Sequence, residues 1–357
     1  MRRRLREMSR RHNIGKGEKI LLRKMKNRRR LSQLLLFLII VPSLSGLGSA
    51  ADSRGSFQLN WENDLLVGTD HSFTNGMKLT WVTPLNLVRT KGNRGNGASA
   101  DLRQGVLFSI GQNIYTPQNI RSTALIVDDR PYAGMLFGEL GIIRRTAHRM
   151  DLLSILAGVV GPLSRAEHFQ KFIHTVTDSL YPMGWDHQLS TEFVFQLFWE
   201  QERKLGLTSE RSGAGLELLP QYGLGMGNLY LYVHGGIQLR LGWNLPDDFG
   251  YPPFRPGGDS FGSDGRIWSD SAASTFGFFI FGGIDSQYVV RNMFLDGNLW
   301  TESHSVEKNV FVWNAVAGAG ISFKGFQLRA AYAYWTKKFI LEESNHLYGT
   351  IQLGFSF

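Results

Sequence analysis

The stretch Phe57-Gln58-Leu59-Asn60-Trp61-Glu62-Asn63-Asp64 alternates apolar and polar side chains over its first six residues. A second alternating run, Met77-Lys78-Leu79-Thr80-Trp81, follows the segment Phe73-Thr74-Asn75-Gly76. A period of two is typical of a β-strand with one face in an apolar medium and the other in a polar one. The two runs therefore predict a pair of strands that meet at a loop, where amide, carboxylate and hydroxyl groups gather.

The same alternation recurs to the end of the chain. An even number of strands is what single-chain outer-membrane barrels have. We therefore predict an all-β fold, a 12-stranded antiparallel transmembrane β-barrel of the outer-membrane type, as a single domain over residues 52–357. The predicted strands are residues 56–63, 75–84, 103–112, 135–146, 149–160, 188–204, 207–220, 228–242, 274–291, 306–322, 325–337 and 345–357.

Three features favour a barrel in lipid over a periplasmic β-sandwich. Several Trp residues fall near predicted strand ends, as in the aromatic girdles of membrane barrels. Tight turns at 204–206 and 324–325 alternate with long loops at 113–134 and 161–187, and the last strand ends in Phe. One loop, 243–273, is long on the side where turns should be short, so it is either an exception or a sign of a miscounted strand.

Residues 1–51 have the features of a secretory signal peptide. An apolar run from Leu34 to Val41 follows three arginines and precedes the small residues 48–51. A basic segment, a short apolar segment and a small-residue cleavage site define such peptides. The run is also far shorter than the roughly 20 apolar residues of a transmembrane helix. We expect cleavage after Ala50 or Ala51, and a start at Met25 would give a leader of ordinary length.

The leader also carries the positive charge of the chain. The whole sequence has 39 Lys and Arg against 30 Asp and Glu, and 14 of the basic but only 2 of the acidic residues lie in residues 1–51. The remaining 25 basic and 28 acidic residues leave the predicted mature protein slightly acidic, so nucleic acid is not an expected partner. The chain has no cysteine, which excludes disulfides and cysteine nucleophiles.

One segment departs from the alternation. Ser164 and Glu167 match a capping box, in which a Ser at the N-cap and a Glu three residues later bond to free backbone N–H groups. The pattern predicts a short amphipathic helix at residues 164–178, in the loop after the fifth strand. A His on a helix is more often a packing residue, but His174 can also act as a general base near neutral pH. Apolar residues follow at helical spacing, at Phe169, Phe172, Ile173 and Val176.

The order of the strands brings three loops to one rim of the barrel. In an up-and-down barrel the connections from odd to even strands all lie on the same side. The loops after the first, third and fifth strands therefore share a rim, and convergent polar groups at one rim are a site hypothesis. The residues concerned are Asn63, Asp64, Thr74, Tyr115, Arg130 and His174.

The segments that carry these residues resemble a known family. Taken together and in this order, over about residues 55 to 357, they are similar to the outer-membrane lipid A 3'-O-deacylases. The motifs are Glu62-Asn63-Asp64, Phe73-Thr74-Asn75-Gly76, Gly111-Gln112-Asn113-Ile114-Tyr115-Thr116-Pro117, Asp129-Arg130-Pro131-Tyr132-Ala133-Gly134, Gly161-Pro162 and Gly184-Trp185-Asp186-His187-Gln188-Leu189.

The resemblance implies a calcium-dependent ester hydrolase that removes the 3'-linked acyloxyacyl group from lipid A of lipopolysaccharide. The family's active-site Asn–Asp pair corresponds to Asn63 and Asp64, its hydroxyl residue to Thr74 and its histidine to His174. Asp64 would bind Ca²⁺, which takes oxygen ligands. His174 would take a proton from the attacking water, while Asn63 and Thr74 orient the water or the oxyanion.

Some family positions have no clear counterpart in this chain. Characterised members can carry a Glu shortly after the His, whereas residues 177–180 read Thr-Asp-Ser-Leu. Asp178 is therefore the candidate for a second calcium ligand. A basic residue that contacts substrate in the third-strand loop corresponds to Arg121, and we expect Tyr115 and Arg130 to bind substrate with it.

The predicted location follows from the barrel and its substrate. Both termini of such barrels are periplasmic, so the shared rim should face the extracellular leaflet of the outer membrane of a Gram-negative bacterium. Lipid A occupies that leaflet. The expected partners are lipid A, outer-membrane lipids and the barrel-assembly machinery, and the protein is expected to be a monomer or a dimer.

Two other functions fit parts of the sequence. Residues 258–262 read Gly-Asp-Ser-Phe-Gly and match the pattern of serine esterases, but that motif needs a strand–turn–helix elbow and here lies in a loop. An outer-membrane serine lipase or phospholipase with Ser260 as nucleophile is therefore the nearest alternative. The other is a passive channel or structural barrel, because twelve strands enclose a lumen that side chains can largely fill.

Overall fold

The computed structural model describes residues 55–64, 72–85, 102–208, 213–259 and 276–356. All of them belong to one compact unit, Ser53–Phe357. The predicted signal peptide and the terminal Phe357 lie outside the described residues. In these described ranges, no helix has the length and apolar character needed to cross a membrane.

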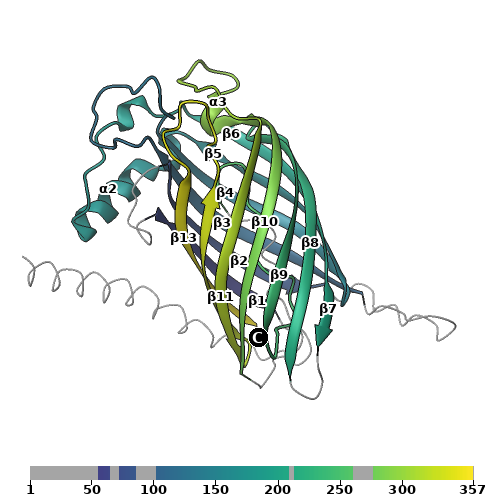
Figure 1. Cartoon of the computed structure of the whole chain (residues 1–357). Helices are drawn as coiled ribbons and strands as arrows, with labels where there is room; N and C mark the ends of the chain where they lie inside the picture. Colours follow the sequence, from purple (N-terminus) through teal and green to yellow (C-terminus); the bar gives the residue numbers. More distant parts are fainter. Residues whose placement is uncertain (1–54, 65–71, 86–101, 209–212, 260–275, 357) are drawn as a thin grey trace, which may run out of the picture. The chain divides into compact units, whose positions relative to one another are not determined.

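Antiparallel strands form one closed barrel (Figure 1). Their order is β6-β5-β4-β3-β2-β1-β13-β12-β11-β10-β9-β8, and β6 pairs with β8 to close the sheet. The strands are β1 (Ser56–Asn63), β2 (Ser72–Pro84), β3 (Arg103–Thr116), β4 (Ala133–Arg145), β5 (Arg149–Val160), β6 (Glu192–Arg203), β7 (Leu205–Thr208), β8 (Ala214–Gly227), β9 (Tyr230–Trp243), β10 (Gly277–Asn292), β11 (Phe311–Phe323), β12 (Phe326–Trp335) and β13 (His346–Ser356).

The short strand β7 continues β6, so the barrel has the twelve strands that the sequence predicted. Glu202 pairs with Gln221 and Leu205 pairs with Leu218, which is one unbroken register along β8. In this register Arg203 lies opposite Pro220. Proline has no backbone N–H to donate, so the ladder is interrupted there. The predicted turn at 204–206 is wrong for the same reason, and the predicted strand 207–220 is shifted toward residues 214–227.

The alternation places the polar side chains of the first two strands inside the barrel. The predicted inward residues Gln58, Asn60, Glu62, Lys78 and Thr80 are all buried. Outward residues such as Trp81, Phe108 and Ile155 are 53–60% exposed in the absence of lipid. This arrangement, apolar outside and polar inside, is that of a membrane barrel.

The two ends of the barrel differ in their connections. We call the end that carries the β1–β2, β3–β4 and β5–β6 connections the helix end, because α2 (Ala166–Thr177) lies there, and the opposite end the terminal end (Figure 1). At the terminal end, β11 and β12 are joined by Lys324 and Gly325, with φ angles of 48° and 81°. Two consecutive positive φ values are typical of a type I′ hairpin turn, and the predicted tight turn at 324–325 is confirmed.

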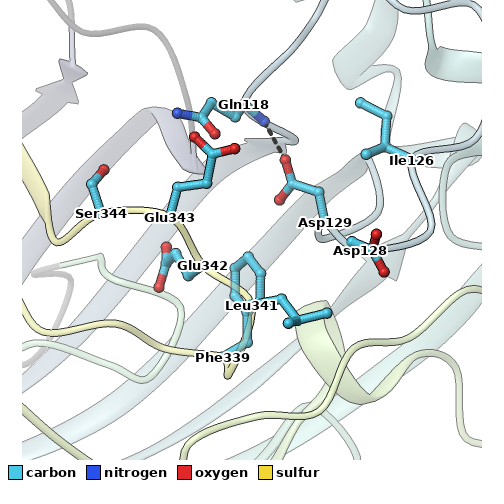
Figure 2. A pocket seen from close by; sticks show the side chains of 9 residues that line it. All are labelled: Gln118, Ile126, Asp128, Asp129, Phe339, Leu341, Glu342, Glu343 and Ser344. Carbon is cyan, nitrogen blue, oxygen red and sulfur yellow. Dashed lines mark hydrogen bonds between the residues drawn. The ribbon is translucent and has the colours of Figure 1, made fainter.

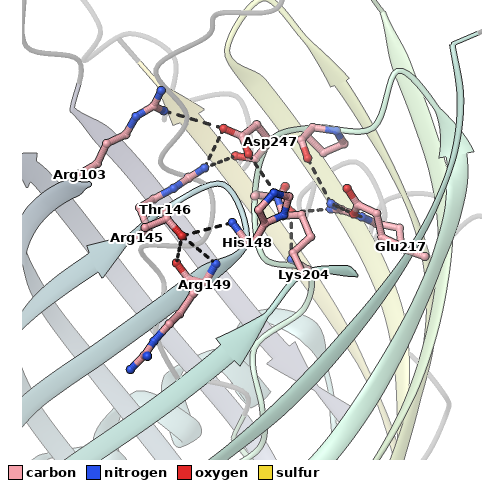
Figure 3. A network of polar contacts seen from close by, with 12 residues as sticks. Arg103, Arg145, Thr146, His148, Arg149, Lys204, Glu217 and Asp247 are labelled. Atoms are coloured by element: carbon pink, nitrogen blue, oxygen red, sulfur yellow. Dashed lines mark hydrogen bonds and ion pairs between the residues drawn. The ribbon is translucent and has the colours of Figure 1, made fainter. Parts of the chain in front are cut away.

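The long loop after β9 is a real exception, because its described part fills the barrel interior. We call residues 244–259 the lumen segment. At the terminal end, Asp247 contacts Arg145 at 2.7 Å and Lys204 at 3.0 Å (Figure 3). Further along, Arg255 pairs with Glu139 inside the barrel at 2.8 Å. The strand count is therefore correct, and the length of this loop reflects its path through the lumen.

Near the helix end, the lumen segment packs against buried aromatic residues of β12 and β13. Tyr348 donates a hydrogen bond to the carbonyl of Gly258, and Phe254 packs against Trp335 and Tyr348. The predicted G-x-S-x-G motif begins in this segment at Gly258, but Ser260 lies outside the described residues. Gly258 and Asp259 are not part of a helix or strand, so the described half of the motif shows no strand–turn–helix elbow.

Candidate active site

The helix in the β5–β6 connection begins at Ala166 and not at the predicted cap. Arg165 occupies the N-cap with a left-handed backbone, and no side chain caps the helix. Ser164 instead ends the short 3-10 helix η3 (Pro162–Ser164), and its hydroxyl donates to the carbonyl of Gly161 at 2.7 Å. Glu167 pairs with Lys171 at 2.5 Å. The capping box is therefore wrong, although the predicted helix is present.

The two faces of α2 are reversed relative to a helix in a soluble protein. Ala166, Gln170 and His174, spaced four residues apart, form its buried face. Phe172 and Val176 on the opposite face are 61% and 51% exposed. A helix of a soluble domain buries its apolar stripe, whereas α2 turns two polar side chains toward the protein and the apolar Phe172 and Val176 away from it.

The helix approaches the barrel wall closely at one strand. A Cβ added to Gly134 of β4 would lie 2.1 Å from the Cβ of Ala166 and 2.5 Å from the hydroxyl of Ser164. On β3, the amide of Gln112 donates to the carbonyl of Ser164 at 2.8 Å. Only a glycine at position 134 lets the start of α2 pack at this distance.

An apolar cluster fixes the rest of the connection against the same outer surface. Its members come from β3, from the β3–β4 and β5–β6 connections and from α2: Ile114, Ile120, Tyr132, Ala166 and Trp185, with Phe169 packed against them. Trp185 lies in the short 3-10 helix η4 (Trp185–His187). Since Ile114 and Gln112 share one face of β3, this cluster shows that α2 lies on the outside of the barrel wall.

A row of polar side chains follows the outer face of the wall at the helix end. Asn63 of β1 donates to Asn75 of β2 at 3.1 Å, and Thr74 of β2 shares a hydrogen bond with Thr116 of β3 at 2.7 Å. A bulge in β2 between Phe73 and Asn75 accommodates Thr74. We call Asn63, Asn75, Thr74 and Thr116 the outer polar row.

The outer polar row is covered, unlike the middle of the outer surface. Asn63, Thr74 and Thr116 are at most 6% exposed, whereas outward residues further along the strands, such as Trp81 and Ile110, are 53% and 50% exposed. The row ends at β3, against which α2 packs. The polar groups satisfy one another by hydrogen bonds, and their position beside the helix makes the row a candidate for substrate contact.

The orientation of the His174 ring is set by one hydrogen bond. Its Nδ1 bonds to the carbonyl of Leu180, which follows the helix. A carbonyl only accepts, so Nδ1 carries a proton, and in the neutral tautomer with this bond the lone pair is on Nε2. Within the described ranges, no hydrogen bond joins His174 to Asn63, Asp64 or Thr74, so the structure brings the helix and the row to the same outer surface without linking them directly.

The two predicted metal ligands have different surroundings. Asp64 is fully buried, one residue beyond β1, whereas Asp178 is exposed and caps the C-terminus of α2 with a left-handed backbone. Across the part of the chain that the structure describes, no group of three or more His, Cys, Asp or Glu side chains is placed to hold a metal ion. A calcium site at Asp64 would therefore need backbone or amide oxygens as further ligands.

The predicted substrate-binding residues lie apart from the outer polar row. Tyr115 points into the barrel, where its ring stacks on Phe294 at 3.9 Å. The guanidinium of Arg130 lies 4.8 Å from the centre of the Tyr115 ring and is buried. Burial lowers the pKa of Arg130, although Tyr115 counteracts this shift. Arg121 is exposed in the β3–β4 connection.

A buried lysine at the same end of the barrel was not expected from the sequence. Lys338, in the β12–β13 connection, donates to the carbonyl of Gly257 at 3.1 Å and lies 4.3 Å from the Trp335 ring. Burial, with a smaller effect of Arg130, lowers the pKa of Lys338 to about 7. Nothing in the sequence marks this lysine, because its burial depends on the path of the lumen segment.

A separate cavity of about 110 Å³ lies between the β3–β4 and β12–β13 connections (Figure 2). Its lining includes four carboxylates, of Asp128, Asp129, Glu342 and Glu343. Asp129 accepts a hydrogen bond from the backbone N–H of Gln118 at 2.6 Å, and Glu342 accepts one from the backbone of Lys338. These contacts order the two connections at the rim, away from His174.

The chain is similar to known outer membrane proteins. A family model described as "Outer membrane protein LpxR" matches residues 33–357. The solved structure of LpxR from Salmonella typhimurium is similar with a TM-score of 0.67 and 19% identity, over 84% of this chain and 99% of that one. The β domain of the Bordetella autotransporter BrkA is less similar, with a TM-score of 0.40 and 11% identity over 85% and 98% of the two chains. No curated protein matches the sequence.

Proposed function

Because the chain belongs to the LpxR family of outer membrane proteins, we propose that it is a lipid A deacylase that hydrolyses the 3'-linked acyloxyacyl ester. The family model agrees with the resemblance drawn from the sequence motifs. The observation that supports the proposal best is the buried polar face of α2, which carries His174 against the outer wall of a membrane barrel.

The position of the site suits a substrate that is itself a lipid. Lipid A in the membrane would approach the outer wall sideways and reach α2 without entering the barrel. The apolar face of α2, with Phe172 and Val176 exposed, would contact acyl chains while the polar face shields the reacting ester. Amphipathic helices that lie at a membrane surface insert their apolar face into the boundary between headgroups and acyl chains.

His174 would act as the general base. Its Nδ1 is bonded to the Leu180 carbonyl, so Nε2 can take a proton from a water molecule as the water oxygen attacks the ester carbonyl carbon. The bond from that carbon to the 3'-oxygen of the sugar then breaks, and the proton on Nε2 passes to the departing oxygen. The products are a free fatty acid and a 3'-hydroxyl, and a positioned base contributes roughly 10²- to 10⁴-fold to such a step.

The outer polar row would orient the water and the ester. Asn63 and Thr74 lie within it and are fixed by hydrogen bonds to Asn75 and Thr116. Fixed groups cost no reorganisation at the moment of reaction, which is why preorganised donors are effective. Tyr115, Arg121 and Arg130 remain candidates for contacts with the sugar and its phosphates, from the rim and the inner side of the wall.

Calcium dependence is part of the proposal. Ca²⁺ would be held by the carboxylate of Asp64 together with backbone or amide oxygens, and Asp178 is a second, more exposed candidate ligand. Bound calcium would polarise the ester carbonyl. Removal of the ion should leave the fold and its stability largely unaffected, because Asp64 follows a strand that is already paired on both sides.

The orientation in the membrane follows from the substrate. Lipid A is in the outer leaflet, so we infer that the helix end is extracellular and the terminal end periplasmic. Insertion would depend on the barrel-assembly machinery, and the protein would act as a monomer or dimer. The passive-channel alternative is disfavoured because the lumen segment fills the barrel, with Asp247, Arg255 and Gly258 bonded along its length.

Mass spectrometry of lipid A from cells with and without the gene tests the proposal. Expression should remove the mass of one 3'-acyloxyacyl group, and the same loss should occur with purified protein and lipid A in calcium. Chelation with EGTA should lower the rate by about 10²-fold or more, as expected for loss of an oxyanion-stabilising group, and calcium should restore it. Unchanged lipid A together with conductance in planar bilayers would instead indicate a channel.

A further inference from the structure

Gln170 has an incompletely bonded side chain on the buried face of α2. It is 2% exposed and lies one helical turn before His174, between that residue and Ala166. Its Oε1 accepts a hydrogen bond from the indole N–H of Trp185 at 2.8 Å. Its Nε2, which carries two N–H donors, has no hydrogen-bond partner within the described part of the chain.

Trp185 determines which way this amide points. The oxygen and nitrogen of a glutamine are easily exchanged in coordinates, but an indole N–H can only donate. The atom that contacts Trp185 must therefore be the oxygen, and the two N–H groups must point away from the indole. Trp185 is itself fixed, since it is 1% exposed and packs against Tyr132 with ring centres 4.9 Å apart.

The unsatisfied amide carries a cost that calls for an explanation. A buried donor without a partner destabilises a protein by about 1–3 kcal/mol. Gln196, a buried glutamine of the barrel wall, by contrast bonds through both its oxygen and its nitrogen to the backbone of Tyr230. The Gln170 oxygen is fixed by Trp185, and its two N–H groups are left to donate to an acceptor that the described residues do not supply.

The location of the amide identifies the kind of group it would meet. Gln170 and His174 lie on one face of α2, about 6 Å apart along the helix axis at 1.5 Å per residue, and both face the protein. If His174 directs water onto an ester carbonyl carbon, the oxygen of the same carbonyl group lies within reach of a neighbouring donor. An N–H group aimed at that oxygen stabilises the negative charge that develops on it.

We propose that Gln170 donates a hydrogen bond from Nε2 to the carbonyl oxygen of the scissile ester, and that Trp185 is the positioning residue that fixes this amide. The proposal rests on the function proposed above, and it adds a donor that belongs to the protein and not to a metal. When water adds to the carbonyl carbon, the carbonyl π electrons move onto the oxygen and the hydrogen bond strengthens. When the ester bond breaks, the electrons return and the amide is unchanged.

Three variants of purified protein in calcium, assayed on lipid A, test the proposal. Gln170→Ala removes the donor and should lower kcat by about 10²- to 10³-fold, as loss of one oxyanion donor does. Gln170→Glu keeps an oxygen for the Trp185 N–H but cannot donate, so it should lower kcat at least as far. Trp185→Phe frees the amide to rotate and should lower kcat about tenfold.

The comparison of kcat with KM separates this role from a structural one. KM should change less than threefold in the Gln170 variants, because the hydrogen bond strengthens only in the transition state. Thr175→Ala, an exposed change on the same helix, is the matched control and should leave both constants unchanged. Thermal unfolding of Gln170→Ala should stay close to the wild type, since the unsatisfied amide is removed while the Trp185 N–H loses its acceptor.

The outcomes distinguish the proposal from the function on which it rests. If the wild type is active and both Gln170 variants have a normal kcat, the role of Gln170 is overturned, whereas the proposed deacylase activity stands. A rise in KM without a fall in kcat would also overturn it, because the amide would then only bind the substrate. A wild type that leaves lipid A unchanged would overturn both.

Discussion

Two groups of buried polar residues, one inside the barrel and one on its outer wall, are built differently. Inside, Asp248 of the lumen segment accepts hydrogen bonds from Arg329 at 2.6 Å and Gln327 at 2.8 Å, and also pairs with Arg240. Outside, Gln170 has two N–H groups without a partner among the residues that the structure describes, and His174 forms a hydrogen bond there through Nδ1. In the inner group a carboxylate is held between two guanidinium groups, whereas in the outer group Gln170 and His174 face the barrel wall without a charged partner in the described residues.

The difference indicates which group serves the fold and which serves the chemistry. A buried ion pair is strongly coupled to the rest of the protein, because removing one partner leaves the other charge unpaired. A residue with unused hydrogen-bonding capacity can be changed at little cost to stability. Substitutions should therefore separate stability from activity.

The largest effect should come from His174→Gln. The substitution keeps an amide near the Leu180 carbonyl but removes the base, so kcat for lipid A should fall by roughly 10²- to 10⁴-fold. The free energy of unfolding should fall by no more than about 1 kcal/mol, because the Gln side chain can keep the hydrogen bond to the Leu180 carbonyl. Deacylation kinetics and urea unfolding in lipid vesicles measure the two quantities. A stability loss as large as the loss of activity would mean that His174 is a packing residue.

The reverse pattern is expected for Asp248→Ala in the lumen. Loss of one partner of a buried charge network should lower the free energy of unfolding by about 3–5 kcal/mol. The folded fraction should keep a normal kcat, because Asp248 lies inside the barrel and α2 outside. Asp151→Ala, which breaks the partly exposed pair with Arg149, is the control and should cost about 0–1 kcal/mol. A kcat that falls with Asp248→Ala would place the chemistry in the lumen.

Gly134→Ala should moderately lower both kcat and the free energy of unfolding. The new methyl group would meet Ala166 and Ser164, so the start of α2 must move outward by about an ångström. Displacements of that size can cost about 10²-fold in rate, and the overpacking should cost about 1–3 kcal/mol of stability. Gly138→Ala on the same strand is the control, since its methyl group would have no neighbour closer than 3.8 Å.

A second substitution checks the cause of the Gly134→Ala effect. The double variant Gly134→Ala, Ala166→Gly restores the space between the wall and the helix, so much of the lost rate should return. Failure of the second change to restore any activity, with α2 still folded by circular dichroism, would show that the contact at Gly134 does not set the position of the helix.

The smallest effect on activity should come from Lys338, which should instead give the stability a pH dependence. Its pKa is about 7 in the folded protein against an ordinary 10.5, so between these values the unfolded chain binds a proton that the folded chain does not. Stability should therefore rise with pH from about 7 to 10.5 and lose this contribution below pH 7. Lys338→Met should flatten the rise, whereas Lys337→Met, an exposed neighbour, should not. Thermal unfolding between pH 7 and 10 measures it, and identical slopes in all three proteins would contradict the assignment.

The sequence alone predicted the barrel because alternation is a local property. Residues such as Phe57, Leu59 and Trp61 show the period directly, and the number of strands follows from counting such runs. The break opposite Pro220 was missed because it concerns the hydrogen-bonding partner on the next strand. The path of the lumen segment was missed because a loop's composition does not say whether it runs outside or inside the barrel.

The candidate site was predicted in part for the same reason. His174 and the Asn63–Asp64 pair were recognisable from residue type and from their motifs, and strand order placed them at one end of the barrel. Gln170 had a signal, its spacing of four residues from His174, but its role depends on the contact with Trp185, which is fifteen residues away. The reversed polarity of α2 could not be read from the sequence, because a helical pattern gives two faces without saying which one is buried.

One measurement tests the central claim most directly: the mass of purified lipid A after incubation in calcium with the wild type, His174→Gln and Ser260→Ala. The claim is that the ester is hydrolysed at the outer wall under α2. It predicts that the wild type and Ser260→Ala both remove the 3'-acyloxyacyl group, while His174→Gln leaves lipid A at its original mass. Deacylation by His174→Gln together with its loss in Ser260→Ala would contradict the claim and indicate a serine esterase.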